Sequence, residues 1–365
     1  MSIYTLPNEI IALLPAYLNN IETFTNASSA CRLFRDNFAT ASPKTILQLA
    51  AASAPTFFSP HPHFLVAATA RQASAWVLQD PATRTPLLHQ ALRGGIPGLY
   101  EFCLEHAGLT LAEIRRLHLA RFDILNPLSD RIDKMAGRQW YQTEHFWDGG
   151  VSEPWTIQTE ADRATFQIVI YGELFGPDMD AFLAAGRRTP DKPVHSIETR
   201  LEFIKYCVPD AMCLKGYRGF AQPENSGPYA NLEDPWALPG DQVALQHILS
   251  CRRWRRMWAD AMRMISRDEA DGKIEDNVNE ESWRTKLWRD ALLVQGLWGM
   301  QLVTLPEARV AKEWLDKGRW LREQIWKLDG PLETRAIGEP WEDPVSLAPD
   351  PSQDVFVCMA ALWRM

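Results

Sequence analysis

The chain has 365 residues, of which 46% are hydrophobic and 23% charged, and it carries a formal net charge of −8. This composition predicts a globular protein with a sizeable core, and the negative balance argues against a nucleic-acid binder that relies on phosphate contacts. No apolar run approaches about 18 residues and the amino terminus lacks a leader pattern, so we expect no membrane span or signal peptide and a cytoplasmic or nuclear location.

The first predicted element spans residues 6–38 and contains two short amphipathic helices. Leu6-Pro7 favours an extended start to the first helix. Helical spacing places four apolar residues of the 6–18 segment on one face: Ile10, Leu14, Tyr17 and Leu18. After a break at Asn19-Asn20, a second apolar stripe follows at Phe24, Ala27, Cys31, Phe34 and Phe38. Helices this short need a partner surface, which is either the rest of the chain or another protein.

This opening stretch resembles an F-box. The pattern is Leu-Pro-x-Glu-Ile, a helix ending in Tyr-Leu, a polar break, and a helix ending in Cys-Arg-x-aromatic-Arg. It is carried here by Leu6, Pro7, Glu9, Ile10, Tyr17, Leu18, Cys31, Arg32, Phe34 and Arg35. The sequence departs from the family at Phe24, where leucine is usual, and at Ala30, where valine is common. The body also resembles filamentous-fungal F-box-like proteins, a likeness that supplies no biochemistry for it.

The resemblance implies a substrate-recognition subunit of a Skp1-cullin-F-box ubiquitin ligase. Residues 1–42 would form the F-box-like module and residues 43–365 a helical body that selects a client protein. The residues implied to contact the Skp1-type adaptor are Leu6, Pro7, Ile10, Leu14, Tyr17, Leu18, Phe24, Cys31 and Phe34. Two alternatives stay open: the helical pair is absorbed in the core, or it is vestigial in an interaction protein of another kind.

The body reads as helices separated by proline, glycine and capping residues. Pro81 and Gly176-Pro177 are predicted to stop helices, and Thr110 with Glu113 forms a capping box. We expect body helices from Pro43 and over residues 62–80, 85–93, 110–126, 159–175, 196–208, 241–265, 281–303 and 304–329. Loop-forming residues 216–240 separate a tryptophan-rich carboxy-terminal part. The predicted fold is therefore all-α, with an amino-terminal helical pair packed on a large irregular helical domain and few or no strands.

Tryptophan is unusually abundant, with fifteen residues, eleven of which lie from Trp236 onward. Their helical spacing favours core filling over an aromatic recognition surface. We expect four of them to be largely buried: Trp254, Trp258, Trp288 and Trp314. The segment CRRWRRMW (residues 251–258) fits a buried stripe flanked by arginines better than a nucleic-acid surface, with an acidic client as the second interpretation.

The densest cluster of polar groups is WYQTEHFWDGG, residues 140–150. Glu144, His145 and Asp148 could form an acid–base group, which makes an all-α enzyme with an aromatic pocket the alternative function. His61 and His63 lack a third ligand nearby, and the six cysteines form no C-x-x-C pair, so we expect neither a metal nor another cofactor. Phosphate-binding, serine-hydrolase and zinc-protease motifs are missing, which favours a receptor without catalytic activity.

Overall fold

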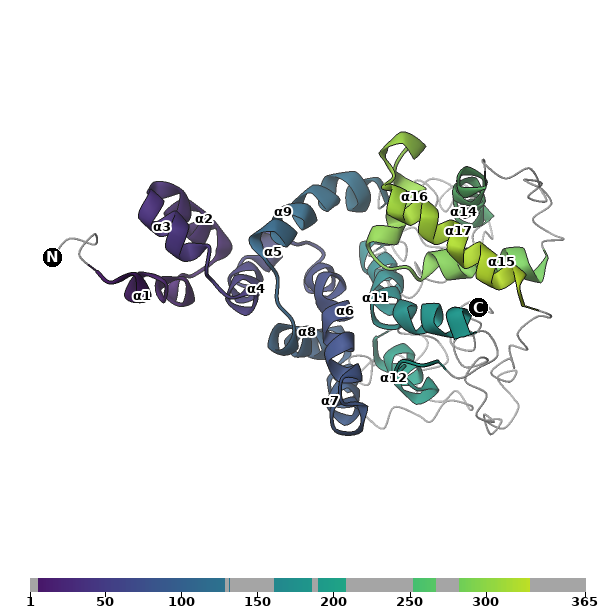
Figure 1. Cartoon of the computed structure of the whole chain (residues 1–365), viewed down its shortest axis with the longest axis horizontal. Helices are drawn as coiled ribbons and strands as arrows, with labels where there is room; N and C mark the ends of the chain where they lie inside the picture. The colour runs from purple at the N-terminus through teal and green to yellow at the C-terminus, as the bar shows by residue number, and fades with distance from the viewer. Residues whose placement is uncertain are drawn as a thin grey trace, which may run out of the picture.

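A computed structural model describes residues 6–128, 131, 161–185, 190–207, 252–266 and 282–328. All the secondary structure in these ranges is helical, without a strand, which confirms the predicted all-α fold. Figure 1 shows the first helices at one end of the molecule and the larger helical body at the other. No helix in these ranges is both long enough and apolar enough to cross a bilayer. Residues 140–150 and 216–240 lie outside the described ranges.

The amino-terminal module consists of α1 (Asn8–Ile11), the 3₁₀ turn η2 (Leu14–Tyr17), α2 (Ile21–Ala30) and α3 (Arg32–Phe38). The prediction of one helix over 6–18 and a second helix running on to Phe38 was wrong. Pro15 cannot donate a backbone hydrogen bond, and the chain tightens into a 3₁₀ turn around it. Cys31 is extended, with φ −156° and ψ 163°, and this separates α2 from α3.

The next helix, α4 (Pro43–Ala51), links the module to the body. The Ser42 hydroxyl caps it by accepting a hydrogen bond from the Thr45 amide (3.1 Å), and Pro43 occupies the first turn, as the sequence predicts. One side of α4 packs against α2, and another packs against α8 (Gly95–His106) and α9 (Leu111–Ala120). The two regions of the molecule therefore share α4 as a common neighbour.

The first half of the body continues with α5 (Ala54–Phe57), α6 (His63–Leu78) and α7 (Pro81–Arg93). The predicted capping box of Thr110 and Glu113 is confirmed at the start of α9, which leads into the π-helical turn η3 (Arg121–Leu125). The predicted start of a helix at Thr85-Pro86 was wrong, because α7 already begins at Pro81 and tolerates Pro86 in its interior.

The second half of the body contains α11 (Ala161–Ala185), α12 (Ile197–Cys207), α14 (Arg252–Ile265), α15 (Trp283–Leu293) and α17 (Lys312–Trp326). Between α15 and α17 lie η6 (Trp298–Met300), α16 (Gln301–Thr304) and η7 (Glu307–Arg309). The prediction of one helix over 281–303 was wrong, because Gly296 adopts φ 79° and interrupts it. The predicted start of a helix at residue 304 was also wrong, since α17 begins only after Ala311.

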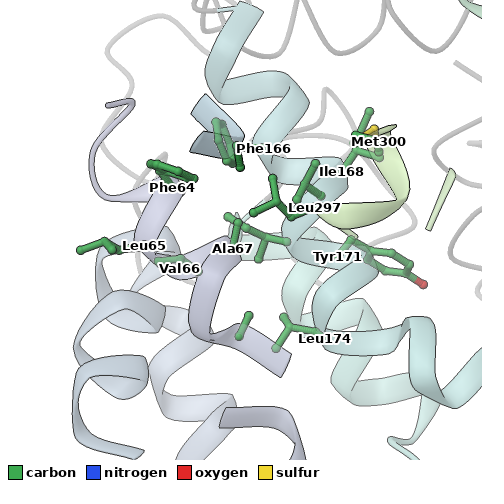
Figure 2. Packing of buried hydrophobic residues seen from close by; sticks show 14 of the residues in the cluster. Phe64, Leu65, Val66, Ala67, Phe166, Ile168, Tyr171, Leu174, Leu297 and Met300 are labelled. Atoms are coloured by element: carbon green, nitrogen blue, oxygen red, sulfur yellow. The ribbon is translucent and has the colours of Figure 1, made fainter. Parts of the chain in front are cut away.

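Helix α11 lies at the centre of the body and packs along α6. Figure 2 shows this contact: Phe64 of α6 faces Phe166 of α11, with ring centroids 5.8 Å apart, and Leu297 and Met300 close the cluster. These four side chains are buried. Burial of the apolar surface between α6 and α11 contributes much of the free energy that holds the two halves of the body together.

The predicted end of α11 at Gly176-Pro177 was wrong, and the helix continues for two more turns. Gly172 and Gly176 let the carbonyl group of Val294 approach the helix surface closely. A Cβ atom added to Gly172 would lie only 2.7 Å from the Val294 carbonyl oxygen, and one added to Gly176 would meet the same atom. Gly176 therefore serves close packing, and Pro177 costs the helix only one backbone hydrogen bond.

The core-filling interpretation holds for only part of the described tryptophans, since several are half-buried and Trp326 is 40% exposed. Trp258 and Trp288 are fully buried, as predicted, and the indole N–H of Trp288 donates a hydrogen bond to the Gly318 carbonyl (3.0 Å). Trp314 is half-buried, so its predicted burial is only partly realised. The side chain of Trp254 lies outside what the structure describes.

Candidate partner-binding surface

An inner cluster of apolar side chains holds the amino-terminal module together. The rings of Phe24 and Phe38 stack with centroids 5.1 Å apart, and Phe34 packs against Phe38 at 5.4 Å. Ile11 and Ile21 complete this buried cluster. The Asn20 side chain caps α2 by accepting a hydrogen bond from the Thr23 amide (2.8 Å), which fixes the turn that folds α2 and α3 back onto α1.

Three large apolar side chains of the module point away from the inner cluster. Ile10 is 46% exposed, Leu13 57% and Tyr17 79%. We call Ile10, Leu13 and Tyr17 the outer row. Single exposed apolar residues are ordinary on protein surfaces, whereas several within one short segment are typical of an interaction site.

The nine predicted adaptor contacts fall into three groups by exposure. Pro7, Ile10 and Tyr17 are exposed, and Phe24 is fully buried. The half-buried group comprises Leu6, Leu14, Leu18, Cys31 and Phe34. Phe24 therefore supports the module from inside, and a contacting protein would meet mainly the first group and the edges of the third.

The single apolar face predicted for residues 6–18 is split between two sides of the module. Ile11, fully buried, lies one position after the exposed Ile10, and Leu14 and Leu18 are only half-buried. Leu13 was missed as a surface residue because the prediction assumed one uninterrupted helix. The signal that could have found it is Pro15, which argues against continuing the helical register past Ile11.

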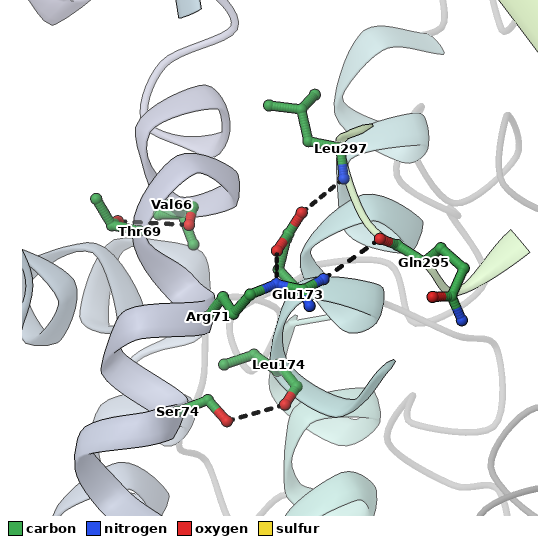
Figure 3. Close-up of polar contacts among 8 residues, drawn as sticks. All are labelled: Val66, Thr69, Arg71, Ser74, Glu173, Leu174, Gln295 and Leu297. Atoms are coloured by element: carbon green, nitrogen blue, oxygen red, sulfur yellow. Dashed lines mark hydrogen bonds and ion pairs between the residues drawn. The ribbon is translucent and has the colours of Figure 1, made fainter. Parts of the chain in front are cut away.

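A buried carboxylate in the body, that of Glu173, is bound by the Arg71 side chain and by the backbone amide of Leu297. We call these three groups the clasp. Glu173 on α11 accepts a hydrogen bond from Arg71 Nε of α6 (2.7 Å) and another from the Leu297 amide (2.7 Å). Figure 3 shows these bonds together with that from Arg71 to the Gln295 carbonyl. The Glu173 side chain is 5% exposed and the Arg71 side chain 45%. The clasp joins α6, α11 and the break after α15 into one unit.

A serine, a histidine and an aspartate come together between α6, α11 and the start of α12. Ser74 Oγ lies 2.8 Å from His195 Nε2 and donates its proton to the Leu174 carbonyl (2.9 Å, Figure 3), so His195 Nε2 donates to Ser74. Asp178 accepts a hydrogen bond from the backbone amide of His195 (3.1 Å), not from its ring. This arrangement does not activate the serine as a nucleophile, because the histidine does not accept its proton.

Burial explains the electrostatics of this cluster. Burial, with a smaller effect of the Arg200 charge, lowers the pKa of His195 to about 4. Burial raises the pKa of Asp178 to about 7, although Arg200 and the His195 amide act in the opposite direction. Ser74 and His195 are both almost fully buried, so a substrate could not reach them. We interpret the cluster as a structural link between helices.

The structure describes only some of the other residues that the sequence suggested for catalysis or metal binding. Glu144, His145 and Asp148 lie outside the described residues. His63 is buried and His61 half-buried, and burial is the main cause that lowers the pKa of His63 to about 3. Across the described ranges no group of three or more histidine, cysteine or acidic side chains could hold a metal ion.

Comparison with known proteins adds no relative from which to transfer a function. No family model, no curated protein and no solved structure matches this chain. The features that suggest a function are therefore the sequence resemblance of residues 6–38 and the exposure of the outer row.

Proposed function

We propose that this chain is the substrate-recognition subunit of a Skp1-cullin-F-box type ubiquitin ligase. In this proposal the amino-terminal module docks a Skp1-type adaptor protein, and the helical body binds a client protein. The observation that carries it is the outer row, Ile10, Leu13 and Tyr17, on a module that extends from one end of the molecule (Figure 1).

The outer row has the chemistry of a docking surface. Burying apolar area contributes about 25 cal/mol per Å², and three large side chains that become buried together would provide a useful share of a binding energy. Tyrosine is enriched at interaction hot spots because its ring gives a large contact area with few rotatable bonds. Tyr17 is the most exposed of the large hydrophobic residues in the described ranges, which makes it the first candidate for a central contact.

The inner cluster would prepare this surface for binding. Because Phe24 and Phe38 fix the fold of α2 and α3, the outer row is held in place before the adaptor arrives. A surface that is ordered in advance loses less conformational entropy on binding. The proposal therefore gives Phe24 a positioning role and gives Ile10, Leu13 and Tyr17 the direct contacts.

Co-expression with a Skp1-type adaptor tests the proposal. We expect the adaptor to copurify with the wild-type chain and to raise its yield. The double variant Leu13→Ser, Tyr17→Ser should weaken binding by about 30-fold or more, since the loss of even one hot-spot residue costs about 2 kcal/mol. A matched control is Leu87→Ser, because Leu87 is 46% exposed on α7 of the body, the same fraction as Ile10.

Two results would contradict adaptor docking. One is a wild-type chain that is monodisperse alone and retains no adaptor in a titration. The other is a double variant that binds the adaptor as tightly as the Leu87→Ser control. Either result would favour an interaction protein whose module serves another contact.

A further inference from the structure

An exposed connection joins the amino-terminal module to α4, and Ser42 lies at its end. Ala39, Thr40 and Ser42 are exposed in this connection, and so are Pro43 and Lys44, which open α4. The backbone of Ser42 is extended, with φ −65° and ψ 146°. Its hydroxyl group is therefore accessible to another protein, together with the residues that follow it.

The residue after Ser42 gives this hydroxyl the pattern that proline-directed protein kinases recognise, a serine or threonine followed directly by proline. In the described ranges the same pattern occurs at Ser59 and Thr85. Thr85 is half-buried inside α7, so an enzyme could reach it as an extended segment only after that helix unfolds. Ser59 is exposed, but the residue before it, Phe58, is buried. Ser42 has neither obstacle.

The start of α4 provides donors for a phosphate on Ser42. The Ser42 hydroxyl already accepts a hydrogen bond from the Thr45 amide (3.1 Å) and lies 2.8 Å from the Thr45 hydroxyl. The first amides of a helix have no acceptor within the helix, and the helix dipole favours negative charge at this end. Lys44 adds a positive charge two positions along the chain. A phosphate here would meet donors from both the backbone and a side chain.

The same turn of α4 is where the module meets the body. The Pro43 carbonyl accepts a hydrogen bond from the amide of Leu109, between α8 and α9 (2.9 Å). A Cβ atom added to the neighbouring Gly108 would lie only 2.7 Å from the Pro43 Cβ atom, so the two segments are in close contact. Figure 1 shows α4 between the module and the body helices. The stability of this turn therefore affects a helix that both regions contact.

We propose that Ser42 is a phosphorylation site for a proline-directed protein kinase and that the phosphate stabilises α4, the connection between module and body. Ser42 Oγ bonds to the terminal phosphorus of a nucleoside triphosphate, and the bond from that phosphorus to its bridging oxygen breaks. The diphosphate leaves, and a base of the kinase takes the hydroxyl proton. The phosphate carries a charge of about −1.5 to −2 at neutral pH. Adaptor docking is not required, because the outer row is not involved.

Phosphorylation of the full-length chain tests the site. A proline-directed kinase is chosen by its activity on a synthetic peptide of residues 37–47, and the folded chain is then treated with this kinase and ATP. We expect phosphate on Ser42, mapped by mass spectrometry, at a rate within about tenfold of that of the peptide. A site that needed unfolding would react more slowly, in proportion to its open fraction. Ser42→Ala should lose this phosphate, and the control Thr85→Ala should retain it.

Hydrogen exchange tests the effect of the phosphate. The amides of α4 should exchange about threefold more slowly in the phosphorylated chain, whereas those of α17 should not change. Ser42→Asp keeps an oxygen acceptor at the start of α4 and adds one charge, so it should slow exchange less. Circular dichroism checks that each variant is folded.

Three results would overturn the proposal. One is that no proline-directed kinase modifies Ser42, either in the peptide or in the folded chain. Another is modification of Thr85 in the folded chain as fast as that of Ser42, since exposure would then not select the site. The third is exchange of the α4 amides that is no slower after Ser42 has been phosphorylated.

Discussion

The amino-terminal module and the body are stabilised in different ways. In the module, buried aromatic contacts such as Phe24–Phe38 dominate, and the hydrogen bonds of its side chains mostly connect residues three or four positions apart. In the body, the clasp joins Arg71 to Glu173 across 102 positions and Leu297 to Glu173 across 124. We therefore expect the module to open without disturbing the body, and the body to lose its parts together.

The largest effect is expected from Glu173→Ala. It removes a buried carboxylate, leaves the Leu297 amide without its acceptor, and deprives the Arg71 guanidinium of its ionic partner while its bond to the Gln295 carbonyl remains. Breaking a buried ion pair in this way typically costs about 3–5 kcal/mol, and the half-exposed Arg71 places the expected loss near the lower end of that range. Urea denaturation followed by circular dichroism measures the change.

A surface ion pair in the same body supplies the control for Glu173→Ala. Glu202 of α12 lies 3.0 Å from Arg93 of α7, with side chains 20% and 57% exposed. Glu202→Ala should cost no more than about 1 kcal/mol. Equal losses in the two variants would mean that the clasp contributes no more than an ordinary surface pair.

Phe24→Ala tests whether the module is an independent unit. Removing a buried phenylalanine ring costs about 3–5 kcal/mol, and we expect this loss to appear only in the amides of residues 6–38. Hydrogen exchange followed residue by residue makes the measurement. If the amides of α6 and α11 lost the same protection, the module and the body would be one cooperative unit.

Gly176→Ala should change the free energy of unfolding by a smaller amount, and the sign of the change is informative. Helix propensity alone predicts that alanine stabilises a helix interior by about 1 kcal/mol. The structure predicts destabilisation by about 1–3 kcal/mol instead, because the new Cβ would collide with the Val294 carbonyl. A thermal denaturation midpoint above that of the wild type would show that this contact is looser than the structure indicates.

The last prediction concerns acid stability and His63, and the size of the effect depends on how far the pH is lowered. Its pKa is lowered to about 3 in the fold against 6.5 in an unfolded chain, so the neutral form stabilises the protein above pH 6.5. That contribution is lost as the pH falls from 6.5 toward 3, by about 1.4 kcal/mol per pH unit for one proton. His63→Phe should remove this slope in urea titrations at several pH values.

Two other buried groups, His195 and Asp178, also make the stability of the fold depend on pH. The pKa of His195 is lowered to about 4, so its contribution to stability is also lost as the pH falls. Asp178, with a pKa raised to about 7, acts oppositely, and its contribution is lost as the pH rises from 3.8 to 7. An unchanged slope in His63→Phe would assign the acid sensitivity to groups other than His63.

Local signals in the sequence predicted several helix starts and the fold class. Ser42 before Pro43 and Thr110 with Glu113 marked helix starts correctly, because capping depends on residues within one turn. Residues that depend on distant partners misled the prediction. Gly176-Pro177 looked like a stop, although Gly176 is required by a carbonyl group more than a hundred positions away.

For the candidate surfaces too, local signals were informative and features that depend on distant residues were missed. The resemblance selected residues 6–38, but exposure within that stretch depends on which side α2 and α3 cover. Leu13 therefore could not be separated from Ile11 by spacing alone once Pro15 ended the regular helix. A cavity lined by Asp180, Lys317 and Trp320 had no sequence signal, because its walls come from α11, α17 and the segment before α12.

The long sequence separation within the clasp also bears on how the chain folds during synthesis. Residues 6–51 contain the module and α4, and we expect the module to fold soon after this stretch leaves the ribosome. Glu173 meets its second donor only when residue 297 has been made, and until then the glycine face of α11 is uncovered. We expect the nascent body to need chaperones during this interval, while the module at its amino terminus is already folded.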